Sequence, residues 1–201
     1  MIEIEKKFLL SEEETQKLIK GSKFVGEIRL EDTYYDLLGF PMMKHDKYLR
    51  SRNGKFELKL PAGDRGKFEV DRYREIENET EISKELSLGN GKIKDELREA
   101  GYFVVAQINS VRKKYKMGEF TVDIDVTDFG YNLVEIELMA PDEGGIEDIA
   151  EKILSFAREA GIKVLPKTDV RRKLLEYLYR QKPEVYEEIV GFWRSTNSTR
   201  L

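Results

Sequence analysis

The chain has 201 residues, of which 40% are apolar and 37% are charged, and its net charge is −4. This composition argues against a disordered chain and against a general nucleic-acid binder, which usually carries a basic excess. The chain has no cysteine and one histidine, His45, which excludes disulfides, thiolate chemistry and a His-rich zinc site. Any metal ion is therefore expected on carboxylates, which suit Mg²⁺ or Mn²⁺.

No apolar run reaches the ~18 residues that a membrane span needs, and no signal peptide precedes Glu3. We therefore expect a cytoplasmic, monomeric protein that binds neither nucleic acid nor membranes. The length suits one large domain, expected over residues 1–192. Residues 193–201 are expected to form a disordered tail, and His45 and Trp193 to be structural or surface residues.

The first half of the chain reads mainly as strands separated by turn signals. A strand is expected at 2–9, followed by a helix that Ser11 and Glu14 open as a capping box. A second strand is expected at 27–36, and then a loop. Strands at 48–52 and 55–60 flank Asn53-Gly54, the signature of a type I′ hairpin. A strand at 67–76, a weakly helical stretch at 79–88 and a helix at 92–100 follow.

The second half begins with another predicted hairpin, at 111–117 and 119–126 around Gly118, and a strand at 133–139. Apolar residues then recur at helical spacing between 144 and 160, and Gly161 ends this helix. Two short helices are predicted at 169–181 and 183–192, the second with Pro183 in its first position.

Most of the predicted strands are apolar on one side and ionised on the other. Glu3, Glu5 and Lys7 share one face of the first strand, opposite Ile2 and Ile4. The charged faces segregate by sign, because some strands carry only bases and others only acids. The bases are Arg50, Arg52, Arg112, Lys114 and Lys116, and the acids are Asp123, Asp125, Glu135 and Glu137.

Two geometries satisfy this alternation. An antiparallel sheet can bury its apolar face and leave the charged face in water. Alternatively, the sheet closes into a barrel with the charges inside and with the helices at 11–20 and 144–160 covering its apolar outside. A lumen of this kind must hold water and a highly charged ligand, because unpaired buried ions are costly.

The chain resembles the CYTH superfamily, the triphosphate tunnel metalloenzymes. Glu3, Glu5 and Lys7 match the E-x-E-x-K signature, and the segments DTYYD (32–36), YLRSR (48–52), FELKL (56–60), VDIDVTDFGY (122–131) and VEIEL (134–138) occur in family order. KLLEYLYRQKPEVY (173–186) is similar to the end of the thiamine triphosphatase branch. The resemblance implies an α+β fold with an eight-stranded antiparallel β-barrel, a charged lumen and covering helices.

The resemblance also implies the site residues. The metal ligands would be Glu3, Glu5, Asp123, Glu135 and Glu137, and Glu3, Glu5 or Glu137 would orient the attacking water. The triphosphate would be held by Lys7, Arg50, Arg52, Lys59, Arg112 and Lys173. Three of the bases have alternatives: Lys173 could extend to solvent from its helix, and Lys114 and Lys116 could be exposed strand lysines. Asp125 is expected behind the metal ligands.

The function implied is a Mg²⁺- or Mn²⁺-dependent hydrolase acting on a small-molecule triphosphate. Thiamine triphosphate, cleaved to thiamine diphosphate and phosphate, is the first candidate. Tyr48 stands where vertebrate-type thiamine triphosphatases have a tryptophan that stacks on thiamine, so the triphosphate is better supported than the thiamine. The alternatives are an inorganic tripolyphosphatase, a class IV adenylyl cyclase and a polyphosphate-binding module without turnover.

Overall fold

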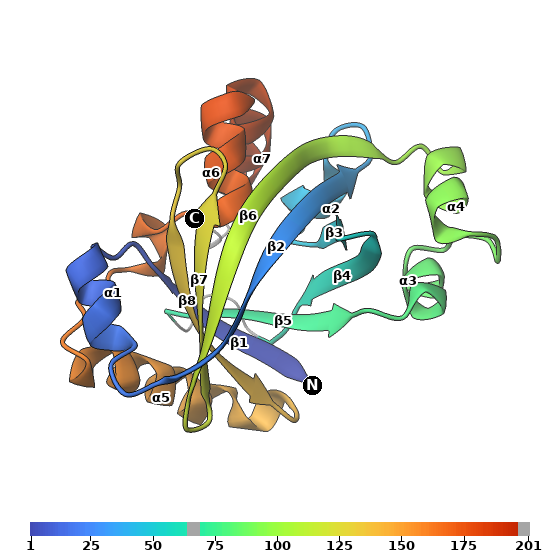
Figure 1. Cartoon of the computed structure of the whole chain (residues 1–201). Helices are drawn as coiled ribbons and strands as arrows, with labels where there is room; N and C mark the ends of the chain where they lie inside the picture. Colours follow the sequence, from blue (N-terminus) through green and yellow to red (C-terminus); the bar gives the residue numbers. More distant parts are fainter. Residues whose placement is uncertain (64–68, 197–201) are drawn as a thin grey trace.

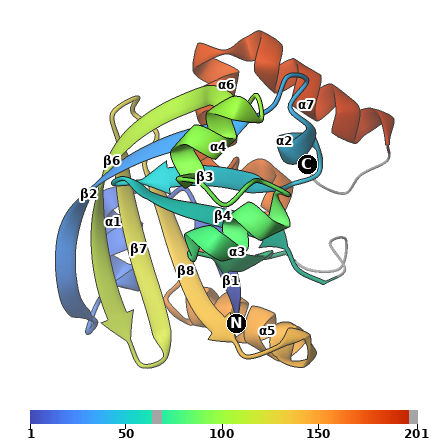
Figure 2. The same cartoon turned by 90° about the vertical axis from the view of Figure 1, so that its right-hand side faces the viewer.

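The centre of the molecule is a closed antiparallel barrel, seen in a computed structural model that describes residues 1–63 and 69–196. The strand order is β1-β5-β4-β3-β2-β6-β7-β8, so β1 closes the barrel between β5 and β8 (Figures 1 and 2). The predicted eight-stranded antiparallel barrel is therefore confirmed. The strands are β1 (Ile2–Phe8), β2 (Lys23–Asp36), β3 (Tyr48–Arg52), β4 (Lys55–Pro61), β5 (Asp71–Ile76), β6 (Phe103–Met117), β7 (Phe120–Thr127) and β8 (Leu133–Ala140).

Helices cover much of the outside of this barrel. On one side, Ile153 and Ala157 of α5 are fully buried in a cluster with Ile4 of β1 and Ile136 of β8. Apolar side chains on these strands therefore point outward, and the charged ones point into the lumen. The helices are α1 (Glu12–Leu18), α2 (Pro41–Lys44), α3 (Glu79–Glu85), α4 (Ile93–Glu99), α5 (Ile146–Glu159), α6 (Lys173–Gln181) and α7 (Pro183–Ser195), with 3₁₀ turns at Glu143–Gly145 and Lys167–Asp169.

The helices α3 and α4 cover a second part of the barrel wall. Ile82 of α3 and Leu97 of α4 are buried against Leu58 of β4 and Ile76 of β5. These four side chains form one buried apolar cluster. The outer face of β4 is therefore shielded from solvent here, as the outer face of β1 is by α5. Because a strand alternates faces with a period of two, this burial directs Glu57 and Lys59 into the lumen.

The helices α6 and α7 pack against each other and lie beside one end of the barrel (Figure 1). Leu174 and Leu178 of α6 share a buried cluster with Ile108 of β6 and Trp193 of α7. Leu174 also lines the lumen. The start of α6 therefore brings Arg172, Lys173 and Leu174 of the C-terminal region into the lumen.

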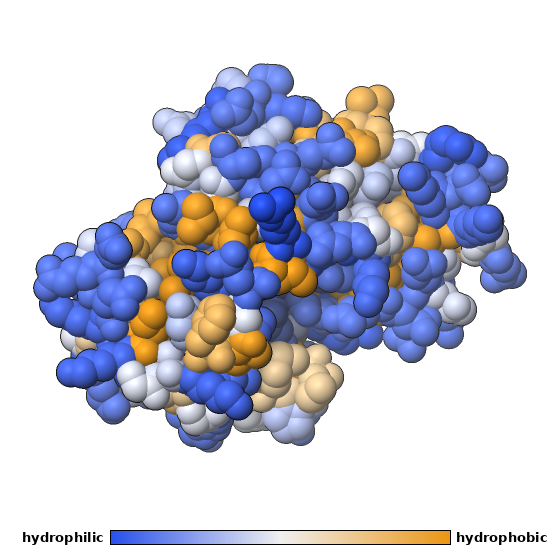
Figure 3. All heavy atoms as spheres, viewed as in Figure 1, coloured by the Kyte–Doolittle hydropathy of each residue, from blue (hydrophilic) through white to orange (hydrophobic). Residues whose placement is uncertain are grey.

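Part of the barrel wall stays open to solvent. Phe24, Val25 and Ile28 of β2 and Val126 of β7 are each about half exposed. Figure 3 shows apolar surface patches among the hydrophilic surface on the face seen in Figure 1. Along this part of the wall the outward apolar side chains are exposed to solvent, and at Phe24 and Val25 a register shift in the β2–β6 pairing interrupts the alternation.

Two hairpins form where the sequence predicted them. At the β3–β4 turn, Asn53 and Gly54 have φ values of 50° and 83°, the left-handed pair that a type I′ turn requires. Strands β6 and β7 turn at Gly118, which has a φ of 57°. The capping box at the start of α1 is also present, because Ser11 and Glu14 accept each other's backbone N–H.

Several predicted boundaries differ from the structure. Strands β2 and β6 are longer than predicted, since they pair from Lys23–Lys116 to Asp36–Phe103. The predicted loop near Pro41 contains α2, whose N–H groups at Met42 and Met43 donate to the Asp36 carboxylate. The strand predicted at 67–76 is observed as Asp71–Ile76, and residues 67 and 68 lie outside the described part of the chain.

The C-terminal boundaries also change. The predicted helix at 169–181 begins at Lys173, because residues 167–169 form a 3₁₀ turn. The last helix does not end at 192 but continues to Ser195, so the predicted tail boundary at 193 is wrong. Trp193 is fully buried and its Nε1 donates to the Lys44 carbonyl. Residues 197–201 of the predicted tail lie outside the described chain.

None of the helices within residues 1–63 and 69–196 combines the length and the apolar character that crossing a membrane requires.

Candidate functional site

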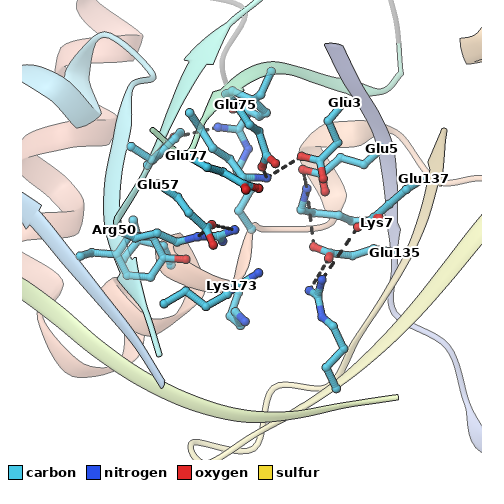
Figure 4. Close-up of a pocket in the computed structure, with 18 of the residues that line it drawn as sticks. Glu3, Glu5, Lys7, Arg50, Glu57, Glu75, Glu77, Glu135, Glu137 and Lys173 are labelled. Atoms are coloured by element: carbon cyan, nitrogen blue, oxygen red, sulfur yellow. Dashed lines mark hydrogen bonds and ion pairs between the residues drawn. The ribbon is translucent and has the colours of Figure 1, made fainter. Parts of the chain in front are cut away.

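The lumen holds a cavity of about 240 Å³ whose lining is almost entirely polar (Figure 4). Strands on opposite sides of the barrel contribute to it, and the start of α6 completes it. The lining residues are the acids Glu3, Glu5, Glu57, Glu75, Glu77, Glu135 and Glu137, the bases Lys7, Arg50, Arg52, Lys59, Arg112, Lys114, Arg172 and Lys173, the tyrosines Tyr34, Tyr48 and Tyr73, and Leu174.

Three of the predicted metal ligands lie together. Glu5 of β1 pairs in register with Glu137 of β8, and Glu3 lies two residues before Glu5 on the same face of β1. One carboxylate oxygen from each of the three lies within 4.8 Å of the others. Close carboxylates repel each other, and burial, with the charges of Glu3 and Asp123, raises the pKa of Glu137 well above its usual range.

This acidic group fits a hard divalent cation. Carboxylate oxygens are the ligands that Mg²⁺ and Mn²⁺ prefer, and a cation would offset the repulsion that raises the pKa of Glu137. A second observation agrees: Oδ1 of Asp123 is buried and has no hydrogen-bond partner among the described residues. Buried carboxylate oxygens are rarely left in this state.

The other two predicted ligands are engaged by bases. Oδ2 of Asp123 accepts hydrogen bonds from Arg112, at 2.6 Å, and from Lys114, at 2.8 Å. Glu135 accepts from Arg112 at 2.7 Å. Neither residue belongs to the group formed by Glu3, Glu5 and Glu137. Asp123 and Glu135 therefore position Arg112, and of the two Asp123 oxygens Oδ1 is the one open to a ligand.

The predicted cations converge on the same cavity. Arg50 contacts Glu57 at 2.6 Å, and Lys59 contacts both Glu3 and Glu75 at 2.5 Å. In Figure 4, Arg50 and Lys173 lie across the cavity from Glu3, Glu5 and Glu137. One part of the cavity thus groups three carboxylates, and the part across from it supplies the bases Arg50 and Lys173, of which Arg50 is paired with Glu57.

Lys7 lies between the carboxylates of Glu5, which it contacts directly, and Asp71, 3.0 Å away. Burial alone would lower the pKa of this ammonium, but the charges of Glu5 and Asp71 outweigh it and hold the pKa above its usual range. Lys7 is therefore a fixed positive charge in the lumen.

Buried carboxylates behind the cavity orient further cations. Arg52 binds Asp32 through two hydrogen bonds, of 2.6 and 2.8 Å, and Arg112 binds Asp125 in the same two-pronged way. The side chains of Asp32 and Asp125 are 0% and 1% exposed. Asp125 was expected behind the metal ligands, but its partners are the lumen bases Arg112 and Lys173.

Lys173 points into the cavity. Its ammonium lies 3.1 Å from Asp125 and 3.2 Å from Asp32, and its side chain is 8% exposed. The alternative in which it extends to solvent is wrong. Lys114 lines the cavity, whereas Lys116 is an exposed strand lysine.

Tyr48 lines the cavity, but its ring is already in contact with a cation. The guanidinium of Arg172 lies 5.5 Å from the centroid of the Tyr48 ring and 5.2 Å from that of Tyr73. The two rings meet edge to face, 6.0 Å apart. The Tyr48 hydroxyl donates to Asp46 and accepts from Arg172.

The sequence reasoning missed several lining residues, of which Arg172 is the most central. A signal for two of them was present: Tyr73 and Glu75 lie two residues apart on β5 and therefore share its inner face. No pattern marked Arg172, because it precedes α6 and lies outside any strand. The other lining residues that were missed are Tyr34, Glu57, Glu77 and Leu174.

Comparisons with known proteins agree with this geometry. The family model "CYTH domain" matches residues 1–172. Human thiamine-triphosphatase is 29% identical over 220 residues, which cover 100% of this chain and 92% of the human protein. The thiamine-triphosphatase of Macaca fascicularis is 28% identical, covering 94% of this chain and 90% of its own.

Solved structures share the fold. The PH1819 protein of Pyrococcus horikoshii superposes with a TM-score of 0.65 at 24% sequence identity, over 90% of this chain and 99% of that one. Because the CYTH model spans most of the chain and the barrel carries a charged lumen, the protein belongs to the CYTH family.

Proposed function

We propose that the protein is a metal-dependent triphosphate phosphohydrolase. The observation that carries the proposal is the division of one cavity into a carboxylate group, Glu3, Glu5 and Glu137, and an opposing set of bases that includes Arg50 and Lys173. A polyanion cannot bind beside carboxylates alone, and a cation cannot bind beside bases alone. A metal ion and a triphosphate together satisfy both walls.

The bases would hold the phosphate chain. Arg50 and Arg112 offer planar guanidinium groups, which suit the paired oxygens of a phosphate group. Lys59, Lys7 and Lys173 add point charges around the same cavity. The buried partners of these bases would keep them in place without a substrate, so that little reorganisation is needed on binding. Arg52, held in place by its two hydrogen bonds to Asp32, would add positive charge to the same cavity.

The metal ion would be held by Glu3, Glu5 and Glu137, with Asp123 adjoining through its open oxygen. Mg²⁺ is the first candidate and Mn²⁺ the second, because both prefer oxygen ligands. When bound, the ion would neutralise charge on the phosphoryl oxygens.

We assign the orientation of the attacking water to Glu137. Glu3 is paired with Lys59, and Glu5 is paired with Lys7, whereas the base nearest Glu137 is Arg112 at 3.9 Å. Glu137 is thus the member of the group with the weakest hold on a base. The water oxygen would bond to the terminal phosphorus, the bridging oxygen would leave, and the products would be orthophosphate and the diphosphate.

Two substrates are favoured by specific observations. The curated relatives are named thiamine-triphosphatase, which supports thiamine triphosphate. Inorganic tripolyphosphate is the other candidate, and the site geometry favours it, because Arg172 already contacts the ring of Tyr48, the residue expected to stack on an organic cation.

The test is orthophosphate release from thiamine triphosphate, tripolyphosphate, ATP and GTP, each with Mg²⁺, with Mn²⁺ and with neither. We expect orthophosphate from thiamine triphosphate or tripolyphosphate when a metal is present. Cyclic AMP and pyrophosphate from ATP would indicate an adenylyl cyclase. Tight tripolyphosphate binding without any product would indicate a binding module.

A further inference from the structure

Arg172 occupies a place in the cavity where two aromatic rings meet. It precedes α6, and its guanidinium lies 5.5 Å from the Tyr48 ring centroid and 5.2 Å from that of Tyr73. Distances within ~6 Å of a ring centroid are those of a cation–π contact. The two rings, called here the Tyr48–Tyr73 pair, therefore form a site suited to a cation. In this structure the guanidinium of Arg172 occupies that site.

Buried carboxylates lock Arg172 in this position. Its Nε and Nη2 donate to the two oxygens of Asp71, at 3.3 and 2.8 Å, and its Nη1 donates to Asp46 and to the Tyr48 hydroxyl. The Tyr73 hydroxyl also donates to Asp46 at 2.9 Å. Asp46 and Asp71 are 4% and 6% exposed.

We propose that Arg172 is a specificity-determining residue that makes the tunnel prefer inorganic tripolyphosphate to a triphosphate whose organic end is a cation. This inference rests on the proposed function and names its substrate class. An organic cation could reach the tyrosine faces only by displacing a guanidinium held by two carboxylates, or by lying beside it and being repelled. A phosphate group at that end meets no such conflict.

A purely structural role for the same contacts makes a different prediction. If Arg172 only fastens α6 to β5, its removal destabilises the fold and lowers the rates on all substrates by a common factor. If it excludes cations, its removal opens the Tyr48 ring beside the carboxylate of Asp46 to an organic cation. Tyr73 keeps its contact with Lys59, and Asp71 keeps its contact with Lys7, so the gain is expected at Tyr48. The ratio of the two rates separates these roles.

The experiment compares kcat/KM for thiamine triphosphate and for tripolyphosphate in the wild type, Arg172→Ala and Arg172→Gln. The Gln variant keeps a hydrogen-bonding side chain and covers the case in which the Ala variant does not fold. Arg171→Ala is the matched control, because Arg171 lies over the Tyr179 ring, binds Glu176 and has a 40% exposed side chain.

We expect the wild type to prefer tripolyphosphate, and the Arg172 variants to shift the ratio toward thiamine triphosphate by about tenfold. Arg171→Ala should keep the wild-type ratio. A ratio in both Arg172 variants equal to that of the wild type overturns the proposal.

Free thiamine, titrated calorimetrically, provides a readout that needs no turnover. It should bind Arg172→Gln more tightly than the wild type, and equal binding to the two proteins would count against the role of Arg172. If the wild type releases phosphate from no triphosphate, the proposed function fails, and the thiamine titration still decides whether Arg172 excludes cations.

Discussion

Within the group formed by Glu3, Glu5 and Glu137, the charge of Glu137 is the least compensated by a base. Glu3 and Glu5 each contact a lysine, whereas no hydrogen bond joins Glu137 to a base in the described chain. Its pKa is raised by burial and by the neighbouring carboxylates. A raised carboxyl pKa means that ionised Glu137 destabilises the folded, metal-free protein above its unfolded pKa near 4.5.

Glu137→Gln should therefore stabilise the metal-free protein at pH 7 while removing its activity. The gain is expected because the amide removes a buried charge that Glu3 and Asp123 repel. Urea unfolding in the presence of a chelator measures the free energy of unfolding, and phosphate release measures the activity. Glu135→Gln is the control and should lose stability, because Glu135 accepts a hydrogen bond from Arg112. A Glu137→Gln variant less stable than the wild type would refute this explanation of the raised pKa.

Arg50→Ala should lower kcat/KM on every triphosphate by a similar factor, because Arg50 is assigned to phosphate and not to the organic group. Removing a charged group that binds its partner in a partly desolvated site costs about 2–5 kcal/mol. Steady-state rates on tripolyphosphate and thiamine triphosphate measure this effect. Arg74→Ala is the matched control, since Arg74 lies on β5 with a 54% exposed side chain. A decrease on one substrate alone would show that Arg50 reads something other than phosphate.

Among the individual elements, the β3–β4 hairpin supplies three of the bases that line the cavity. It carries Tyr48, Arg50, Arg52 and Lys59 on two short strands. The register of these strands, in which Arg50 lies opposite Glu57, is set by the two-residue turn. A one-residue slip would move every base on one strand to the outer face.

Gly54→Ala should destabilise the protein by about 1–2 kcal/mol, because Gly54 has a φ of 83°, where a Cβ is strained. In the described chain no atom lies within 4 Å of the place of that Cβ, so the strain is the only penalty. We expect a lower thermal midpoint and an unchanged KM for tripolyphosphate, because the strain is confined to the turn. A changed KM would indicate that the hairpin register had shifted.

Much of the barrel wall was predictable because strands alternate their faces. The period of two placed Arg50 and Lys59 each on the charged face of its own strand, and Asn53-Gly54 identified the turn. Whether the charged faces meet in a lumen could not be read in the same way. Alternation alone fits both a solvated sheet and a closed barrel, and the pairing of β1 with β8 that closes the barrel joins strands far apart in the chain.

The partners of the charged side chains were also beyond prediction from local patterns. Arg172 and its carboxylate partner Asp71 are 101 residues apart in sequence. Lys173 could be read equally well as a solvent-exposed helix residue, because its burial depends on where α6 meets the barrel. Asp123 was predicted as a metal ligand, and its ion pairs with Arg112 and Lys114 follow from the β6–β7 register.

Across the protein as a whole, a set of ion pairs ties the barrel strands and the start of α6 together. Buried carboxylates lie at its nodes: Asp32, Asp71 and Asp125. Burial would raise the pKa of each, but Arg52, Arg172 and Arg112, respectively, outweigh it, and all three pKa values lie below the usual range. The stability that these groups supply is complete above their unfolded pKa near 3.8 and is lost as the pH falls below it.

The free energy of unfolding should therefore drop steeply as the pH falls from about 5 to 2. Asp32→Asn should cost about 3–5 kcal/mol at pH 7, because it removes one partner of a buried ion pair. The difference in stability between the wild type and this variant should shrink as the pH falls from about 4 toward 2, since the unfolded wild type then gains a proton at this carboxyl group while the folded protein keeps it ionised. Urea titrations at several pH values measure both curves, and a constant difference between them at all pH values would rule out the assignment.

The proposed hydrolysis requires that the two walls of the cavity act together, one on a metal ion and the other on a triphosphate. Orthophosphate release from tripolyphosphate, followed as Mg²⁺ is titrated into the metal-free wild type and into Glu5→Gln, tests this requirement. We expect no release without a divalent cation, saturable activation in the wild type, and a half-saturating Mg²⁺ concentration at least about tenfold higher in the variant, since even the removal of a group that supports a metal ligand typically lowers metal affinity about 10–100-fold. Release by the wild type without any divalent cation, or the same Mg²⁺ dependence in both proteins, would show that the carboxylate wall does not serve a metal ion.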